Sequence, residues 1–219
     1  MNIFLSIVFI ILSFAMLLLF YKMYKKLGLF LWIVIAMILS NIQALKLIEV
    51  FSVDVALGGL LYATLFTATN ILNEKYGKNE ATKAIGIGVF SMLAMAVLMY
   101  VAVLFVPSSN DFVNDSMTEL FKLNLRVAIG TITSFAASQY INIYIYNKLK
   151  DSGKIYMRSN ISTILAQVVD KILFTIIAFV GLIPMSNLIL LMIVGTIFGI
   201  IISIISTPVL YIAKNIDEE

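Results

Sequence analysis

The sequence predicts an all-α polytopic membrane protein, a bundle of about seven transmembrane helices with the N-terminus outside and the C-terminus inside. Of its 219 residues, 62% are hydrophobic and 12% are charged, whereas a soluble domain is about half apolar and about a quarter charged. The mean hydropathy of the chain is +1.05. Apolar runs near the length of a membrane-spanning helix, about 20 residues, recur along it, and the loops between them alternate in charge. We therefore expect one membrane domain over residues 1–219.

Seven apolar runs are candidate membrane spans. Many of their residues are Val, Ile or Phe, which favour strands in water, but in a bilayer a long run must satisfy its backbone hydrogen bonds internally and forms a helix. The third run is the shortest and contains Gly58 and Gly59. Its helix could therefore be tilted, broken or partly re-entrant, and these alternatives stay open. The first run lacks the features of a signal peptide, and we expect a retained helix. The expected spans are Ile3–Tyr21, Leu29–Phe51, Val55–Ile71, Ala84–Val106, Leu123–Tyr146, Ile161–Ile183 and Leu188–Ala213.

Basic residues concentrate in every second loop. The loops after the first, third and fifth runs and the C-terminal end carry Lys or Arg, whereas the loop after the fourth run is acidic and the loop after the sixth has no charge. The positive-inside rule then places the N-terminus outside and the C-terminus inside. This distribution accounts for the pI of 9.0 without a nucleic-acid partner. The basic residues of these loops and of the C-terminal end are Lys22, Lys25, Lys26, Lys75, Lys78, Lys83, Lys148, Lys150, Lys154, Arg158 and Lys214.

The chain contains no Cys and no His. Disulfides, thiolate zinc sites and thiol nucleophiles are therefore excluded, and so are the commonest general base and metal ligand. No paired catalytic carboxylates are visible, which argues against an enzyme. The chain also lacks the phosphate-binding pattern G-x-x-x-x-G-K-[ST], so energy for transport must come from a gradient, from metabolic trapping or from a partner. No cofactor and no metal ion are expected.

Polar residues at membrane depth are the informative ones, because a charge at a helix centre costs about 2.5–3.5 kcal/mol on insertion scales and usually faces a cavity or a partner. At the end of the third run and just beyond it, Asn70, Asn73 and Glu74 share one face of a continuing helix at i, i+3 and i, i+4 spacing. They are candidate ligand contacts at the inner end of a path through the bundle. The alternative is a helix end at the inner interface, with Glu74 paired to Lys78.

The sixth run carries Gln167, Asp170 and Lys171, with Asp170 close to its middle. Gln167 and Asp170 share a face of the helix. Because neighbouring residues on a helix do not face each other, we expect Asp170 and Lys171 to point to different neighbours. The functional interpretation is substrate recognition or proton coupling, and an interhelical ion pair is the alternative.

The fifth and second runs supply the remaining candidates. Gln139 and Asn142 lie one turn apart on the fifth run, and Arg126 near its outer end either joins the site or snorkels to the interface. On the second run, Asn41 contacts either another helix or the ligand, and Lys46 either snorkels or reaches the site.

Polar groups on several converging helices describe a binding site near the membrane midplane, where transporters bind their substrates. Many amides and few charges favour a neutral or weakly charged heterocycle as the ligand. Aromatic rings are available to stack on such a ligand: Tyr62, Phe66, Tyr140, Tyr144 and Phe174.

Five segments of the chain together resemble one known family. In order they are "SNIQALKLIEVF", "LFTATNILNEKYGKNEATKA", "RVAIGTITSFAASQYINIYIYNKLK", "RSNISTILAQVVDKILFTIIAFVG" and "STPVLYIAK". The combination resembles the queuosine precursor transporter family, also called the vitamin uptake transporter family. The resemblance implies membrane uptake of 7-deazaguanine compounds, queuine and its precursors, which are used for a modified tRNA nucleoside. It divides the chain into an extra N-terminal helix and basic loop, residues 1–28, and a family core, residues 29–214.

The chain departs from the pattern of this family at several positions. The family usually has Asp where this chain has Asn70 and Asn142, and Thr where it has Lys171, whereas Gln167 and Asp170 are retained. A cationic aminomethyl precursor would lose its best partners through these changes. The resemblance with its departures therefore favours a neutral base or another ligand.

We expect a membrane transporter for 7-deazaguanine bases such as queuine, or for a related nucleobase-like molecule, in the plasma or inner membrane. Two alternatives stay open: a substrate-binding membrane subunit that works with a separate ATPase, and a divergent paralogue with another ligand. The expected partners are the small-molecule substrate and the lipid bilayer, and a homodimer is compatible with a bundle of this size.

Overall fold

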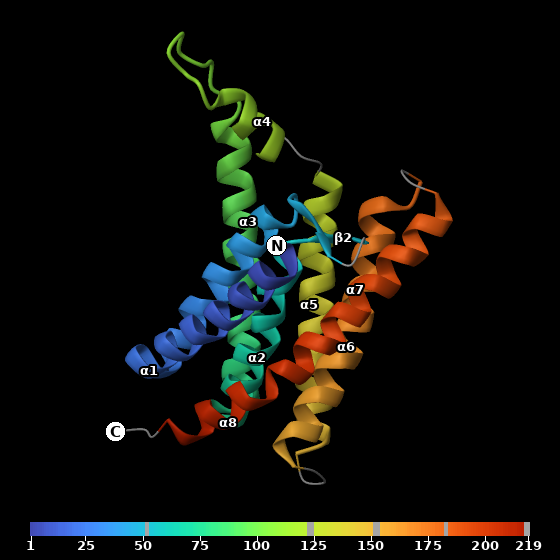
Figure 1. Ribbon diagram of the computed structural model, residues 1–219. Helices are drawn as coiled ribbons and strands as arrows, with labels where there is room; N and C mark the ends of the chain where they lie inside the picture. The colour runs from blue at the N-terminus through green and yellow to red at the C-terminus, as the bar shows by residue number, and fades with distance from the viewer. Residues whose placement is uncertain (51–52, 122–124, 151–153, 182–183, 217–219) are drawn as a thin grey trace.

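Long helices of very different exposure pack together in the computed structural model (Figure 1). The structure describes residues 1–50, 53–121, 125–150, 154–181 and 184–216. Within these ranges, four helical runs are long and apolar enough to cross a membrane, which agrees with a helical membrane bundle: Asn2–Gln43, Lys78–Ala102, Ile155–Phe179 and Met185–Asn215. The helices are α1 Asn2–Gln43, α2 Gly58–Tyr76, α3 Lys78–Ala102, α4 Asn114–Phe121, α5 Leu125–Lys148, α6 Ile155–Phe179, α7 Met185–Ile205 and α8 Thr207–Asn215.

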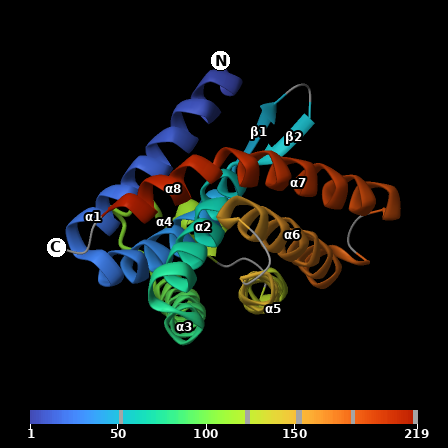
Figure 2. The same cartoon turned by 90° about the horizontal axis from the view of Figure 1, so that it is seen from below.

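α1 folds back on itself at Lys25, where φ is 50° and ψ is −127°. Its two halves form a V in Figure 2. Gly28 permits the turn, because a Cβ at this position would overlap the carbonyl oxygen of Phe20. The rings of Phe20 and Trp32 then pack edge to face with their centroids 5.9 Å apart, a favourable geometry for aromatic pairs. The turn lies between the first and second expected spans.

A two-stranded hairpin corrects two expected helix ends, within a fold that is otherwise the expected all-α bundle. The apolar runs predict helix through Phe51 and again from Val55, but α1 ends at Gln43 and α2 begins at Gly58. Between them, strands β1 (Leu47–Val50) and β2 (Val53–Ala56) pair in antiparallel register. β-branched residues favour a strand here, and apolar content alone does not distinguish a short strand from the end of a helix.

α2 is the buried centre of the bundle. It contacts α1, α3, α5, α6, α7 and α8, and every residue in 63–73 is buried. Gly58 lets the start of α2 approach α1, because a Cβ there would overlap the carbonyl oxygen of Ser40. Trp32 Nε1 of α1 donates a hydrogen bond to Thr64 Oγ1 at 3.0 Å. From Gly58 on, the third expected span is therefore an unbroken central helix, and its polar residues from Thr64 to Asn70 are buried.

The last expected span, Leu188–Ala213, is two helices instead of one, because a new helix begins at Thr207. Pro208 stands at the start of α8, and its missing N–H cannot continue the hydrogen bonding of α7. Asn160 of α6 bonds to both sides of this break. Its Nδ2 donates a hydrogen bond to Thr207 Oγ1 at 3.0 Å, and its Oδ1 accepts one from Ser203 Oγ at 3.2 Å.

The remaining expected spans correspond to helices with shifted ends. The sequence predicts Ala84–Val106, Leu123–Tyr146 and Ile161–Ile183, where the structure has α3, α5 and α6. Leu123 and Ile183 lie outside the described residues. The acidic loop after α3 contains the short helix α4, which the sequence analysis does not predict.

Replacing Gly58 with Ala should destabilise the protein, because the new Cβ would overlap backbone of α1 that can move only if the two helices separate. We expect a loss of about 1–3 kcal/mol, the usual cost of overpacking, measured as a lower melting temperature in detergent. Gly59→Ala is the matched control, since nothing lies within 4 Å of a Cβ at that position, and it should keep or raise the melting temperature. Equal melting temperatures for both variants would contradict the close approach of the helices.

Candidate functional site

Asp170 joins three helices at one end of a polar stripe. Its side chain on α6 is only 4% exposed. Oδ1 accepts a hydrogen bond from the Tyr62 hydroxyl of α2 at 2.8 Å and a second, longer one from Ser138 Oγ of α5 at 3.4 Å. Oδ2 lies 3.2 Å from Lys171 Nζ. Both carboxylate oxygens of Asp170 are therefore engaged.

The expectation that Asp170 and Lys171 point to different neighbours is wrong, and the alternative of an interhelical ion pair is wrong as well. The two residues form an ion pair within α6, and Lys171 Nζ also lies 5.2 Å from the centroid of the Tyr62 ring. A lysine side chain is long and flexible enough to bend back to the adjacent carboxylate. The expectation that neighbouring helix residues face apart holds only for shorter side chains. Gly195 of α7 borders this stem, since a Cβ there would lie 3.1 Å from Lys171 Cδ.

Asn70 is the next polar residue along α2, and it also joins α2 to α5 and α6. Its Nδ2 donates to Ser159 Oγ at 2.9 Å and to Thr163 Oγ1 at 3.0 Å, both on α6. Its Oδ1 accepts a hydrogen bond from Asn142 Nδ2 of α5 at 2.8 Å. All four residues are buried, so the structure brings Asn70 and Asn142 together as the sequence analysis expects.

Glu74 follows one turn later and is held by the same two helices. Its Oε2 accepts a hydrogen bond from the Tyr146 hydroxyl at 2.9 Å, and its Oε1 is paired with the guanidinium of Arg158. The expected alternative partner, Lys78, is therefore replaced by a partner on α6. We refer to Glu74, Tyr146 and Arg158 as the Glu74 cluster.

Further contacts close the end of the bundle that holds the Glu74 cluster. Asn147 Nδ2 donates to Asn73 Oδ1 at 3.0 Å. Arg158 Nη1 donates to the carbonyl oxygen of Lys150 at 3.0 Å, and the Arg158 guanidinium carbon lies 5.4 Å from the centroid of the Tyr146 ring. Side chains of α2, α5 and α6 are therefore tied to one another on each side of the ion pair.

The register of this stripe follows from helical spacing. Tyr62, Phe66, Asn70 and Glu74 are four residues apart on α2, which aligns them along one face. Ser138, Asn142 and Tyr146 repeat that spacing on α5, and the partners on α6 run in the reverse order from Asp170 to Arg158. A single polar stripe thus links the three helices over three turns.

Several amide atoms beside this stripe lack a hydrogen-bond partner among the described residues. Gln139 is 0% exposed, and neither its Oε1 nor its Nε2 is bonded. Gln167 Nε2, Asn142 Oδ1 and Asn73 Nδ2 are also buried without a partner. An unsatisfied buried polar group costs about 1–3 kcal/mol, so each of these atoms is an uncommon feature that a polar ligand would relieve.

Gln167 is further constrained by Gly199 of α7. A Cβ at Gly199 would overlap Gln167 Oε1. The glycine therefore leaves the space that the glutamine amide occupies, and the amide reaches the boundary between α6 and α7.

Three predicted site residues do not join this group. Asn41 Nδ2 donates to Thr131 Oγ1 at 3.4 Å and links α1 to α5. Lys46 is exposed in the turn between α1 and the hairpin. Arg126 belongs to the first turn of α5, but its side chain lies outside the described part of the structure.

Sequence reasoning assigns two important residues to other roles. It treats Tyr62 as a stacking ring, and the ring does pack edge to face against Phe66 at 5.9 Å between centroids, but the hydroxyl is what binds Asp170. It treats Arg158 as a loop residue that marks the inner side. Arg158 directly precedes Ser159, the first residue of the polar face of α6. This position is the feature of the sequence from which its burial could have been predicted.

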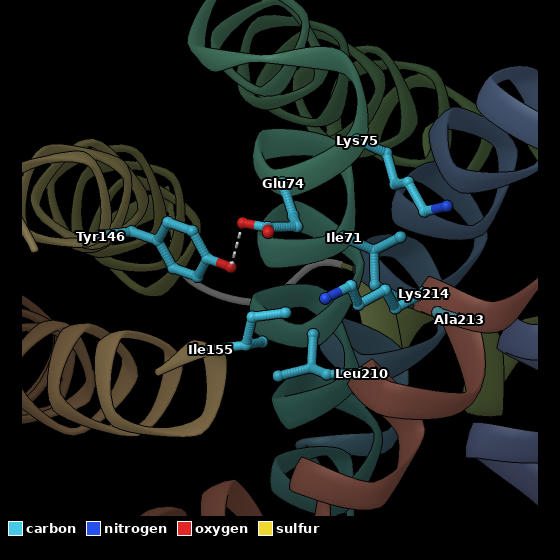
Figure 3. A pocket seen from close by; sticks show the side chains of 8 residues that line it. All are labelled: Ile71, Glu74, Lys75, Tyr146, Ile155, Leu210, Ala213 and Lys214. Carbon is cyan, nitrogen blue, oxygen red and sulfur yellow. Dashed lines mark hydrogen bonds between the residues drawn. The ribbon is translucent and has the colours of Figure 1, made fainter. Parts of the chain in front are cut away.

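A small pocket is lined in part by Glu74 and Tyr146, and in Figure 3 the Tyr146 hydroxyl points at the Glu74 carboxylate. Its volume of about 10 Å³ is close to the minimum for one water molecule, so a heterocycle can enter only if the surrounding helices separate. Three of its lining residues belong to α8. The lining residues are Ile71, Glu74, Lys75, Tyr146, Ile155, Leu210, Ala213 and Lys214.

Comparison with known proteins agrees with the sequence resemblance. A family model described as "Putative vitamin uptake transporter" matches residues 56–213. A protein of Bacillus subtilis (strain 168) described as "Probable queuosine precursor transporter" is 35% identical over 213 residues, which cover 95% of this chain and 93% of that relative. No solved structure matches the chain. The chain is a multi-pass membrane protein and belongs to the vitamin uptake transporter family.

Proposed function

We propose that this chain takes up queuosine precursors, 7-deazaguanine bases such as queuine, across the plasma or inner membrane. Similarity to the Bacillus subtilis protein over nearly its whole length supports the class of substrate. The observation in the structure that carries the proposal is the fully buried Gln139 amide, which has no partner in the described residues. A transporter needs such groups to be vacant when its substrate is absent.

The chemistry of the vacant groups fits the edge of a heterocyclic base. A guanine-like edge presents donors and acceptors side by side, and a glutamine or asparagine amide offers one of each. Gln139 supplies both functions, Gln167 supplies an N–H donor, and Asn142 supplies an acceptor. Asn70 holds Asn142 in position through the bond between their amides, so part of the site is preorganised. A set of neutral amides gives directional recognition without burying a net charge.

The proposed topology has seven spans, with the N-terminus outside and the C-terminus inside, in one domain over residues 1–219. In Figure 1 the turn of α1, the start of α6 and α8 lie at one end of the bundle, and α4 and the hairpin lie toward the opposite end. The first group carries Lys25, Lys154 and Lys214 in or beside it. This separation of basic and acidic ends supports the orientation that the positive-inside rule gives.

The Glu74 cluster acts in this proposal as the inner closure of the substrate path. It ties α2 to α5 and α6 through a hydroxyl and a guanidinium, and the adjoining pocket has room for about one water. Release of a base toward the inside then requires this cluster to open. Either Asp170 or Glu74 is the candidate group for coupling that movement to a proton.

Uptake in a bacterial strain that lacks its own precursor transporter and precursor synthesis tests the function. Cells that express this chain should accumulate labelled queuine or its precursors and restore queuosine in tRNA, whereas cells with an empty vector should not. The host should contain no dedicated ATPase partner, so that uptake would reject the alternative of an ATPase-dependent subunit. Absence of uptake for every 7-deazaguanine, with the protein present in the membrane, would reject the proposed substrate class.

Gln139→Leu should abolish most uptake while keeping or raising stability. The substitution removes two buried groups that have no partner in the described residues, so the empty protein loses no hydrogen bond, but the ligand loses its contacts. We expect substrate affinity to fall by about tenfold or more, as for a ligand edge left unpaired. Gln43→Leu is the matched control, because Gln43 Oε1 is also unpartnered but lies at the end of α1. Unchanged uptake by Gln139→Leu would remove this residue from the site.

Asp170→Asn should lower uptake while preserving expression. Asn keeps the size of the side chain but removes the charge that pairs with Lys171, and losing one partner of a buried charged pair changes an affinity by about tenfold or more. Asp115→Asn in the exposed helix α4 is the control for the same chemical change. Transport rates in membrane vesicles, normalised to protein amount, measure the effect, and full uptake by Asp170→Asn would eliminate its role.

A further inference from the structure

We infer that Lys171 sets the charge selectivity of the site, so that this protein accepts neutral ligands and discriminates against cationic ones. The inference rests on the proposed function and names the chemical class of base that the site takes. Lys171 follows Asp170 directly on α6. Among the described residues, Asp170 and Glu74 are the two acidic side chains of the polar stripe.

Both carboxylate oxygens of Asp170 already have partners within the protein. Oδ1 accepts hydrogen bonds from Tyr62 and Ser138, and Oδ2 is paired with Lys171 Nζ at 3.2 Å. A buried carboxylate is the natural partner of a cationic ligand. Here the protein supplies that cation itself.

Lys171 is held in this place by more than the ion pair. Its Nζ lies 5.2 Å from the centroid of the Tyr62 ring, within the range of cation–π attraction. The ring is itself fixed by edge-to-face packing against Phe66 and Phe135 at 5.9 and 6.2 Å between centroids. Gly195 of α7 leaves room for the lysine stem. Ring, carboxylate and glycine together position one ammonium group.

The rest of the site offers no unpaired negative charge to a cationic ligand. The unpartnered amide atoms there belong to the neutral side chains of Gln139, Gln167, Asn142 and Asn73, and the unpartnered Arg158 Nε belongs to a cation. Glu74, the remaining acid of the stripe, is already paired with Arg158. Within the described residues, the stripe contains two acids and two bases and its charges sum to zero. A cationic ligand would be desolvated beside an ammonium group, which disfavours it.

The test uses two 7-deazaguanines that differ in charge at one position. One carries a neutral nitrile at C7, and the other carries an aminomethyl group, which is protonated at pH 7. Competition of each against labelled ligand in proteoliposomes gives a ratio of affinities. We expect the wild-type protein to prefer the neutral compound by about tenfold or more, the size of effect seen for close charge pairs.

Lys171→Met tests the residue itself. Without the ammonium group Asp170 becomes available, and the preference for the neutral compound should fall by about tenfold or reverse. Lys171→Arg keeps the positive charge and should keep the preference. Lys83→Met, at an exposed position that pairs with Glu80, is the control and should leave the ratio unchanged. The ratio is measured within one preparation, so differences in protein amount cancel.

The possible failures are distinguishable. If the wild-type protein binds neither compound, the proposed function is rejected together with this inference. If it binds both equally or prefers the cation, the inference alone is rejected, and this result needs no variant. An unchanged ratio in Lys171→Met would remove Lys171 as the determinant even where the wild-type protein prefers the neutral compound.

Discussion

The need of α2 to satisfy its buried polar groups sets the arrangement of the helices around it. α2 contacts six other helices and residues 63–73 are all buried, so an amide or acid along this helix finds its partners mainly on neighbouring helices. Asn70 and Glu74 are satisfied only where Asn142 and Tyr146 of α5 come level with them. Apolar packing tolerates small shifts between helices, but these bonds do not. The polar stripe therefore fixes the registers of α2, α5 and α6.

Two ion pairs lie at the two ends of this stripe, with neutral amides between them. Asp170 and Lys171 form one pair, and Glu74 and Arg158 form the other. Each pair neutralises itself locally, which lowers the cost of charges at membrane depth. Under the proposed function, the region between them recognises a ligand by the direction of hydrogen bonds instead of by charge. This division would separate the groups that hold the helices together from those that contact a substrate.

Sequence patterns predict most of the polar residues that gather in the structure, because i, i+3 and i, i+4 spacing identifies a shared face. Asn70 and Asn142 meet as that spacing suggests. The patterns cannot predict which long side chain reaches which acid: Lys171 turns back to Asp170, and Arg158 takes the place expected for Lys78. Hydropathy likewise finds the apolar runs but not the hairpin or the break before Pro208, because local backbone geometry decides both.

The vacant amide of Gln139 means that the empty protein is held below the stability its fold could reach. A leucine of similar size would suit the buried position better in the absence of substrate, so selection for folding alone would replace the glutamine. Under the proposed function, its presence represents a trade-off between stability and activity. Substrate would recover the missing free energy on binding and act as a stabilising ligand of the folded state. The loaded transporter would then resist unfolding and proteolysis better than the empty one, and its lifetime in the membrane would depend on the supply of its substrate.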